Sequence, residues 1–338
     1  MKTGKLPGNI VKLSMLNQLH TKNKQVISGA AVGADCAFLE IPQNQFCVVC
    51  SAEGELNTKE MSGEDNGTGF TIAQLIQICF NRLAAGGARP VAAFFSLFLP
   101  EETENIWIRS LMAEAENVCS LYSVQTAGVH GCVLKEIRKP AAVVNGYGSA
   151  AADRKRTLKN SAPFQDIVLS KWVGLLGTVI LAERYKEQIC GHYPAFLMEN
   201  VEHFHECCSV LKEAEIALTC KVSAMYAASE GGIFAALWEL SEGAGVGFEV
   251  DLKKVPLRQE TVEICEFLGA NPYELHSEGC LVMTADDGEE LVKALRAEGI
   301  EAVTIGRTTD QKGKIIQNDD EVRYMDRPKQ DEIFRNCL

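Results

Sequence analysis

The stretch Asp166–Thr178 reads DIVLSKWVGLLGT and decides the fold class of the second half of the chain. Its first five residues form an apolar run of strand length, and the residues after them read as helix. Helical and strand patterns then alternate. We expect helices at 231–242, 259–268 and 287–298, and strands at 219–225, 246–251, 280–285 and 301–306. This alternation predicts a layered α/β domain whose helices cover a sheet.

The first half of the chain alternates in the same way. Thr71 is a candidate N-cap for a helix that carries its apolar residues on one face and ends at Gly86-Gly87. Residues 55–69 are rich in Gly, Glu, Asn and Asp and predict a mobile loop. We also expect a short amphipathic helix near 10–19, a helix at 102–120, and strands at 36–41, 46–51, 91–99, 123–128 and 141–147.

Residues 148–166 form the clearest boundary in the sequence. They hold glycine, a run of alanines, a short basic cluster and Pro163, without a sustained hydrophobic period. A chain of 338 residues is also too long for one ordinary core. We therefore expect two α/β domains with mixed sheets covered by helices, one at 1–150 and one at 151–338.

Composition disfavours several classes of function. The net charge is −12 and no strongly basic block occurs, so the sequence does not predict nucleic-acid binding. No run reaches the roughly 18 apolar residues that span a bilayer, and the N-terminus lacks the apolar core of a signal peptide. We expect a cytoplasmic protein without a membrane partner, whose thirteen cysteines are thiols.

Several motifs in the second half fall in a specific order. They are KWVGLLGT at 171–178, SEGGIF at 229–234 with LWE at 237–239, GVGFEVD at 245–251, PLR at 256–258, SEG at 277–279 and GR at 306–307. In the first half, GKLP at 4–7, GADCA at 33–37 and GGARP at 86–90 precede them. This ordered set of motifs resembles the aminoimidazole ribonucleotide (AIR) synthase, or PurM-like, superfamily, and most of all its hydrogenase-maturation branch.

The resemblance implies a fold, a cofactor and a partner. It implies a two-domain AIR-synthase-like fold, with metal-binding aspartates in the N-terminal domain and a C-terminal domain that closes over ATP. It also implies a homodimer built mainly from N-terminal strands. The residues that it assigns to nucleotide binding are Asp35, Asn81, Arg82, His130, Lys171, Gly174, Gly177, Thr178, Glu230, Gly231 and Gly232. The glycines would hold phosphates through backbone N–H groups near helix starts.

The chain departs from the family where carboxylates are needed, because ATP phosphates are held through Mg²⁺ and Mg²⁺ prefers hard oxygen ligands. Asp35 is retained, and Glu53 is an approximate substitute for a second aspartate. Arg82, directly after Asn81, stands where the family has aspartate, and Ala227 replaces another. The metal ligands that remain are therefore Asp35 and Glu53, and the site is expected to be degenerate.

An arginine at a Mg²⁺ ligand position would repel the ion, but it can pair directly with a phosphate or a carboxylate. We expect Arg82 to face the cleft between the domains and to form an ion pair with Asp35. The family element around His130 reads AGVHG at 127–131 and lacks its glutamate. His130 remains a candidate ligand contact, beside the alternative of a loop histidine.

Three cysteine-containing segments are weaker candidates. His203–Cys208 holds four metal-ligand side chains, which a helix would separate into two pairs. Cys47 and Cys50 have the spacing of a zinc or redox motif, but strand alternation points them to opposite faces. Cys337 resembles the modified terminal cysteine of the hydrogenase-maturation branch, although Leu338 follows it. Each segment also has a structural interpretation without function. His203–Cys208 would be a half-buried helix, Cys47 and Cys50 would belong to an ordinary strand, and Cys337 would be a terminal thiol present by chance.

Two functions from different classes remain open. In the first, the chain is an ATP-dependent synthetase, kinase or dehydratase that acts on a small molecule or a peptide thiol. In the second, it has reduced or lost Mg-ATP chemistry and binds a nucleotide or other anion, or serves as a dimeric partner protein. Arg82 and Ala227 favour the second.

Overall fold

The computed structural model describes residues 4–6, 8–31, 37–58 and 69–335. The chain divides into two compact units. The first takes in Met1–Leu83 and Ala88–Lys155, and the second takes in Ala84–Gly87 and Arg156–Leu338. Each unit is built on a sheet of its own, and both sheets contain parallel and antiparallel pairs.

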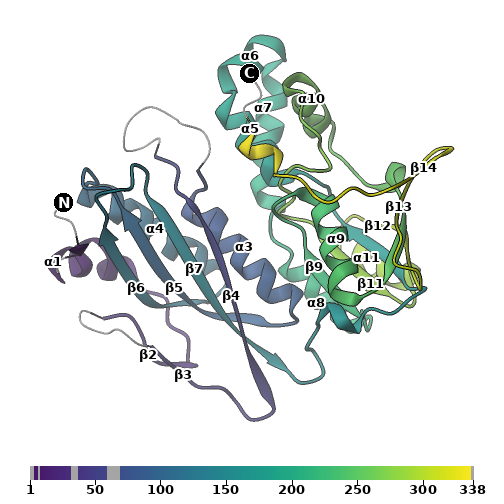
Figure 1. Ribbon diagram of the computed structural model, residues 1–338. Helices are drawn as coiled ribbons and strands as arrows, with labels where there is room; N and C mark the ends of the chain where they lie inside the picture. Colours follow the sequence, from purple (N-terminus) through teal and green to yellow (C-terminus); the bar gives the residue numbers. More distant parts are fainter. Residues whose placement is uncertain (1–3, 7, 32–36, 59–68, 336–338) are drawn as a thin grey trace. The chain divides into compact units, whose positions relative to one another are not determined.

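The first unit contains a five-stranded sheet of order β1-β6-β5-β7-β4 (Figure 1). The parallel pair is β5 with β6, and the other neighbours are antiparallel. A separate hairpin, β2 with β3, precedes β4 in the chain. The strands are β1 (Gly4–Lys5), β2 (Val26–Ser28), β3 (Phe38–Leu39), β4 (Gln45–Glu55), β5 (Arg89–Leu99), β6 (Gln125–Val133) and β7 (Ala141–Ala151). The long strand β4 lies at the edge of the sheet.

Two long helices, α3 (Ile72–Ala85) and α4 (Asn105–Leu121), lie on one face of this sheet (Figure 1). Helix α3 begins at a capping box, because the Thr71 hydroxyl accepts from the Gln74 N–H at 3.2 Å and the Gln74 side chain accepts from the Thr71 N–H at 2.9 Å. It ends where Gly87 adopts a φ of +80°. Both ends of this helix were predicted from the sequence.

The second unit contains a seven-stranded sheet of order β14-β13-β10-β12-β8-β11-β9. The parallel pair is β10 with β13. The strands are β8 (Asp166–Ser170), β9 (Ala224–Ala227), β10 (Gly247–Asp251), β11 (Leu281–Ala285), β12 (Ala302–Thr309), β13 (Lys314–Asn318) and β14 (Glu321–Tyr324). Its helices are α5 (Leu175–Arg184), α6 (Lys186–His192), α7 (Ala195–Glu202), α8 (Leu211–Thr219), α9 (Gly232–Ala244), α10 (Gln259–Leu268) and α11 (Gly288–Ala297).

Alternate residues of β8 separate two hydrophobic cores. Ile167 and Leu169 pack with α9 on one face of the sheet, whereas Val168 packs with α8 and α11 on the other. Both faces are therefore buried, which explains why the strand reads as a continuous apolar run. The predicted α/β class with mixed sheets covered by helices is confirmed, and no helix in the described residues is long and apolar enough to cross a membrane.

Several local predictions need correction. Strand β7 continues through Ala151 and pairs with β4, although the alanine and glycine residues there carry no strand signal. The predicted helix near 10–19 is present as contiguous α-helical (α1, Gly8–Ile10), π-helical (Val11–Met15) and 3-10 (Leu16–Gln18) turns, but its buried residues are Ser14 and Met15, whereas Leu13 of the predicted apolar face is 52% exposed. The hairpin β13–β14 was missed, because its strands are short and mostly polar on an exposed edge.

Candidate functional site

Arg82 lies in the last turn of α3, with its side chain exposed. Its Nη1 donates a hydrogen bond to the backbone carbonyl of Ser51 on β4. This contact fixes the guanidinium at the edge of the sheet. Arg82 forms no ion pair with a carboxylate within the described residues. Asp35, its expected partner, lies outside them, so the predicted pair is untested.

The neighbours of Arg82 differ in burial. Asn81 is fully buried, and its Oδ1 accepts from Gln77 Nε2 at 2.8 Å, so it belongs to the packed face of α3. Glu53 is exposed on β4, two residues beyond Ser51, whose hydroxyl lies 3.5 Å from Glu53 Oε2. The first unit thus places a guanidinium and a carboxylate beside the same stretch of one edge strand.

His130 lies on β6 and not in a loop. Its ring stacks on Phe94 of β5 with centroids 5.0 Å apart, and its Nε2 is buried without a hydrogen-bond partner in the described part of the chain. Gly128 makes this stack possible, because a Cβ there would lie 1.9 Å from the Phe94 ring. A buried ring nitrogen without a partner is costly, which keeps His130 a candidate ligand contact.

In the second unit, the KWVGLLGT motif forms the turn between β8 and α5. Gly174 caps α5 in the left-handed region at φ +78°, and its N–H donates to Ser277 Oγ at 2.9 Å. The Gly177 N–H donates to the His276 carbonyl at 2.8 Å. The Thr178 hydroxyl bonds to the Gly174 carbonyl and to Thr261, both within 2.8 Å. These polar groups all bind protein atoms here.

The SEGG motif forms the start of α9 in a comparable way. Gly231 has φ +75°, and its N–H donates to Asp331 Oδ2 at 2.7 Å. Gly232 has φ +67°, and a Cβ there would lie 2.4 Å from the Tyr273 carbonyl oxygen. Its N–H donates to the Ser229 carbonyl, while Glu230 is exposed. A phosphate at Gly231 would therefore have to displace a carboxylate of the same chain.

Lys171, the first residue of the KWVGLLGT motif, points into the interior of the second unit. Its Nζ lies 2.5 Å from Glu213 Oε1 and donates to the carbonyls of Cys207 and Ser209. The two charged side chains are only 10% and 4% exposed. Lys171 therefore holds the segment before α8 against the end of β8. This internal role competes with its expected part in nucleotide binding.

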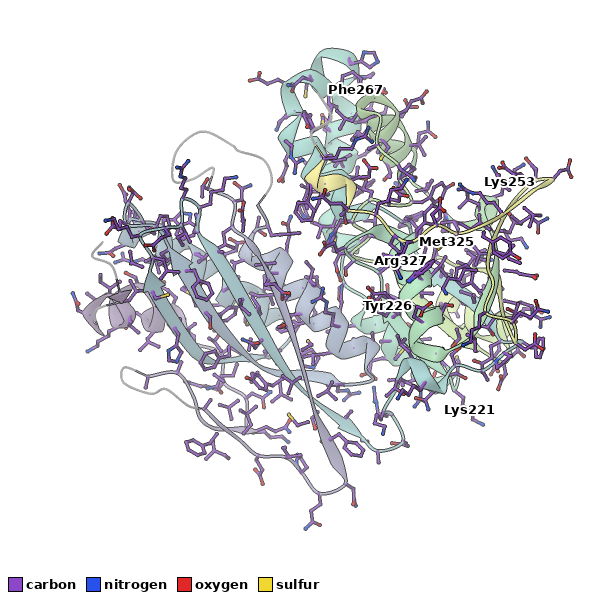
Figure 2. The ribbon with its side chains drawn as sticks, viewed as in Figure 1. Lys221, Tyr226, Lys253, Phe267, Met325 and Arg327 are labelled. Atoms are coloured by element: carbon purple, nitrogen blue, oxygen red, sulfur yellow. The ribbon has the colours of Figure 1, made fainter. Side chains whose placement is uncertain are left out.

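Ala227 ends β9 and is 6% exposed, in the core that includes Val210 and Leu281. Tyr226, the residue before it, is labelled in Figure 2 and donates its hydroxyl to Glu239. An aspartate at position 227 would thus be buried among apolar side chains, at the desolvation cost of an unpaired carboxylate.

Sequence reasoning missed a pocket in the first unit. Its volume is about 450 Å³, and it is lined by residues from the loops before β2 and β4 and from the ends of β5 and β7. Its charged lining residues are Lys24, Arg89 and Arg154. Polar side chains, including Gln45 and Ser149, complete the wall. Three cations around a polar pocket favour an anionic ligand. The sequence signals were the GGARP motif, which contains Arg89, and the short basic cluster, which contains Arg154.

The cysteine-rich segments are placed as follows. Residues His203–Cys207 form a 3-10 turn rather than an α-helix; His203 bonds to Glu206, and Cys208 is buried. Cys47 is exposed and Cys50 contacts α3, so the two thiols point to opposite faces as predicted. Cys337 lies outside the described residues. Within the described ranges, no three His, Cys, Asp or Glu side chains form a group that could hold a metal ion.

Comparison with known proteins finds a family match in the second half of the chain and relatives over most of its length. Residues 167–318 match the family described as AIR synthase related protein, C-terminal domain. Carbamoyl dehydratase HypE of Rhodobacter capsulatus is 29% identical over 245 residues, which are 69% of this chain and 68% of that protein. The second half of the chain therefore contains an AIR-synthase-related C-terminal domain.

Solved structures show the same fold for nearly the whole chain. E. coli HypE, a hydrogenase maturation protein, superposes with a TM-score of 0.77 at 17% identity, covering 96% of this chain and 99% of that one. HypE in complex with ATP gives a TM-score of 0.75 at 18% identity, covering 97% and 96%. The predicted resemblance to the hydrogenase-maturation branch is thereby confirmed.

Proposed function

We propose that the whole chain is an AIR-synthase-related protein that binds a nucleotide or another anion as a homodimer, with reduced or lost Mg²⁺-dependent chemistry. The observation that carries the proposal is Arg82, a fixed guanidinium at the position where the family has a metal-binding aspartate. Its hydrogen-bond acceptor Ser51 lies on β4 two residues before Glu53, and the Ser51 hydroxyl is 3.5 Å from Glu53 Oε2. These residues fit Mg²⁺ poorly, because a guanidinium replaces one of the oxygen ligands that the ion prefers.

A guanidinium can supply the positive charge that Mg²⁺ would otherwise supply to a phosphate. It carries a positive charge and several N–H donors in a planar fork, so it binds phosphate oxygens directly. The Nη1 of Arg82 bonds to the Ser51 carbonyl, which orients the remaining donors. ATP is the ligand of a solved HypE with the same fold. We therefore take ATP as the first nucleotide to test.

The pocket of Lys24, Arg89 and Arg154 is a second place in the first unit that suits an anion. It lies between the loops before β2 and β4 and the first residues of β5. A compact anion such as pyrophosphate would suit a pocket lined by three cations better than a neutral metabolite would. Binding experiments therefore need to separate this pocket from Arg82.

The proposed homodimer uses the N-terminal strands. Strand β4 is an 11-residue edge strand that exposes Phe46 (46%) on one face and Val49 (57%) on the other. The β2–β3 hairpin exposes Ile27 (67%) and Phe38 (64%). Long exposed edge strands with apolar side chains invite pairing with a second chain. We expect light scattering to give twice the 36.9 kDa of one chain, and Val49→Glu to give the monomer mass.

Two assignments accompany this proposal. The domains are proposed to be 1–150, AIR-synthase-like N-terminal, and 151–338, AIR-synthase-like C-terminal. The protein is proposed to act in the cytoplasm, because the described cysteines are free thiols and free thiols persist in a reducing compartment.

The alternative is an active ATP-dependent enzyme that resembles the hydrogenase-maturation dehydratase or a small-molecule kinase. The exposed carboxylate of Glu53 on β4 favours it, since one accessible oxygen ligand of the family's metal site persists. The two proposals differ in the effect of Mg²⁺ on ATP. In the first, Mg²⁺ adds little; in the second, binding and turnover both depend on it.

Isothermal titration of the full chain with ATP and with pyrophosphate, in Mg²⁺ and in EDTA, tests the proposal. We expect Kd values within about threefold of each other in the two buffers, and ATP hydrolysis at background. Arg82→Gln should weaken ATP binding at least tenfold if Arg82 is the contact, whereas Arg154→Gln should do so if the basic pocket is. Arg109→Gln, an exposed change on α4, is the matched control. Robust Mg²⁺-dependent turnover, or no binding of either probe, would overturn the proposal.

A further inference from the structure

Two cysteines from different elements of the first unit meet between β4 and α3. Cys50 is half-buried on β4, and Cys79 is fully buried on α3, with their Sγ atoms 3.5 Å apart. Each thiol also lies near the other's backbone carbonyl, at 3.1 Å from Cys50 Sγ and 3.9 Å from Cys79 Sγ. The two sulfurs therefore face one another.

The neighbouring strand leaves room for both sulfurs. Gly146 of β7 pairs with Cys50 in the sheet. A Cβ at position 146 would lie 2.6 Å from Cys79 Sγ and 3.6 Å from Cys50 Sγ. Any larger residue would push the buried thiol away. The absence of a side chain at Gly146 is thus part of the geometry that brings the thiols together.

The two thiols have different acidities. The hydrogen bond from Cys79, together with the nearby charge of Arg82, lowers the pKa of Cys50 below its ordinary value of 9.0. The hydrogen bond to Cys50 and burial raise the pKa of Cys79. Cys50, which is also the accessible member, is therefore the thiolate that reacts first. Cys79 remains protonated beside it as the second, resolving thiol.

Other buried cysteines lack this arrangement. Burial raises the pKa of Cys119 and of Cys280 to about 12, and no second thiol hydrogen-bonds to either of them in the part of the chain that the structure describes. They fit inert packing residues. Cys47 is exposed but points away from Cys50. The Cys50–Cys79 contact thus combines accessibility, acidity and a facing partner.

We propose that Cys50 and Cys79 are a reversible oxidation site that forms an intramolecular disulfide with a low-molecular-weight disulfide as the oxidant. The Cys50 thiolate attacks one sulfur of the reagent, the reagent's S–S bond breaks, and one reagent thiolate leaves. Cys79 then loses its proton to solvent and attacks the Cys50 sulfur, and the second reagent thiolate leaves. The two protein thiols are oxidised, and the reagent is reduced to two thiols.

The reaction needs only a small movement. The sulfurs must approach from 3.5 Å to the roughly 2.05 Å of a disulfide bond. The product would tie α3 to β4 one helical turn before Arg82. Oxidation would therefore hold the guanidinium's helix against the edge strand that accepts its hydrogen bond. This site does not depend on whether the protein binds ATP.

Mass spectrometry of the full chain in glutathione redox buffers tests the proposal. Oxidised glutathione should remove two alkylatable thiols and join the tryptic peptides 25–59 and 60–82. Dithiothreitol should reverse both effects. Cys50→Ser and Cys79→Ala should each abolish the cross-link, whereas Cys47→Ser, on the same peptide, should retain it. Fragment ions must place the bond at Cys50 rather than at Cys36 or Cys47.

A second readout separates chemistry from simple proximity. Arg82→Gln removes the charge that lowers the Cys50 pKa. It should move the pH at half-maximal iodoacetamide labelling of Cys50 upward, and slow the cross-link at pH 7 by severalfold. A stable mixed disulfide at Cys50 without closure, a different cysteine pair, or no oxidation in fully oxidised buffer would each overturn the proposal.

Discussion

Asp331, near the C-terminus, binds the first turn of a helix one hundred residues earlier in the chain: its Oδ2 accepts from the Gly231 N–H at 2.7 Å. Its Oδ1 accepts from the His276 and Ile333 N–H groups at 3.2 and 3.0 Å. The carboxylate is 1% exposed. A negative charge at a helix N-terminus is stabilised by the dipole and the unpaired N–H groups. The C-terminal segment is thus anchored where the sequence predicted a phosphate.

This anchor holds a long segment in place. Met325 and Arg327, labelled in Figure 2, lie on the stretch that leads from β14 toward Asp331. His276 Nδ1 is 3.4 Å from Asp331 Oδ2, so an imidazole also borders the carboxylate. The contact joins the C-terminal segment, the SEGG turn and the segment before β11.

Asp331→Asn should destabilise the second unit by about 1–3 kcal/mol, because the amide nitrogen cannot accept the Gly231 N–H and a buried donor loses its partner. Urea titration followed by tryptophan fluorescence measures this, since Trp172 and Trp238 both lie in the second unit. Asp320→Asn, in the exposed turn between β13 and β14, is the control and should leave the midpoint unchanged. An unchanged midpoint for Asp331→Asn would show that the charge of Asp331 and its bond to the Gly231 N–H add no net stability.

Lys171→Met should destabilise the second unit by about 3–5 kcal/mol, because it leaves the carboxylate of Glu213 buried without its cation. Methionine keeps most of the side-chain volume, so the loss reports the charge. The exposed pair Lys293–Glu289 on α11 is the matched control, and Lys293→Met should unfold at the wild-type midpoint. Denaturant titration of both variants checks the contrast. Comparable losses in the two would mean that burial does not distinguish the pairs.

Local sequence patterns predicted helices and strands. The contacts that define the candidate site join residues far apart in the sequence, so no local pattern could predict them. Helix α10 was predicted at its observed bounds of 259–268, and Thr71 was predicted as a cap, because both signals lie within a few residues. The Lys171–Glu213 pair spans 42 positions and the Gly231–Asp331 contact spans 100, and neither has a periodic signature. The GLLGT and SEGG motifs were identified, but not the acceptors that occupy their N–H groups.

Stability should fall at alkaline pH because buried thiols resist ionisation. Burial raises the pKa of Cys119, Cys208 and Cys280 to about 12, from an ordinary value of 9.0. Above pH 9 the unfolded chain loses these protons while the folded chain keeps them. The stabilisation is therefore complete below about pH 9 and is lost as pH rises toward 12, at about 1.4 kcal/mol per pH unit for each thiol.

Urea titrations between pH 8 and 10.5 measure this slope. Cys280→Ala should reduce it by about 1.4 kcal/mol per pH unit above pH 9, since one titrating group is removed. The control is Val282→Ala. Val282 lies on β11 and is fully buried, as Cys280 is, and its substitution removes side-chain volume but no ionisable group. It should lower stability at every pH and leave the slope alone. Equal slopes in Cys280→Ala and wild type would contradict the role of the thiol.

Arg82 lies on the surface, so substitutions there should affect ligand binding more than the free energy of unfolding. The side chain is exposed, and within the described residues it donates one hydrogen bond, to the Ser51 carbonyl. Arg82→Ala should therefore cost no more than about 1 kcal/mol of unfolding free energy, the range of a single exposed contact. A cost of about 1–3 kcal/mol would instead support a partly buried ion pair, such as the one expected with Asp35. Urea titration decides between the two.

Arg82→Asp should then change the ion dependence of ligand binding. It replaces the guanidinium by a carboxylate on the same turn of α3, near Glu53 and the Ser51 carbonyl of β4. Under the proposed function, ATP affinity in EDTA falls because the phosphate loses its cation, and Mg²⁺ restores part of it by bridging carboxylate and phosphate oxygens. Ala227→Asp is best left out, since position 227 is 6% exposed and an aspartate there would be buried. Titration with ATP in EDTA and in Mg²⁺ measures the effect, with Arg82→Asn as the neutral control. If Arg82→Asp binds ATP like the wild type in both buffers, the guanidinium does not contact the anion.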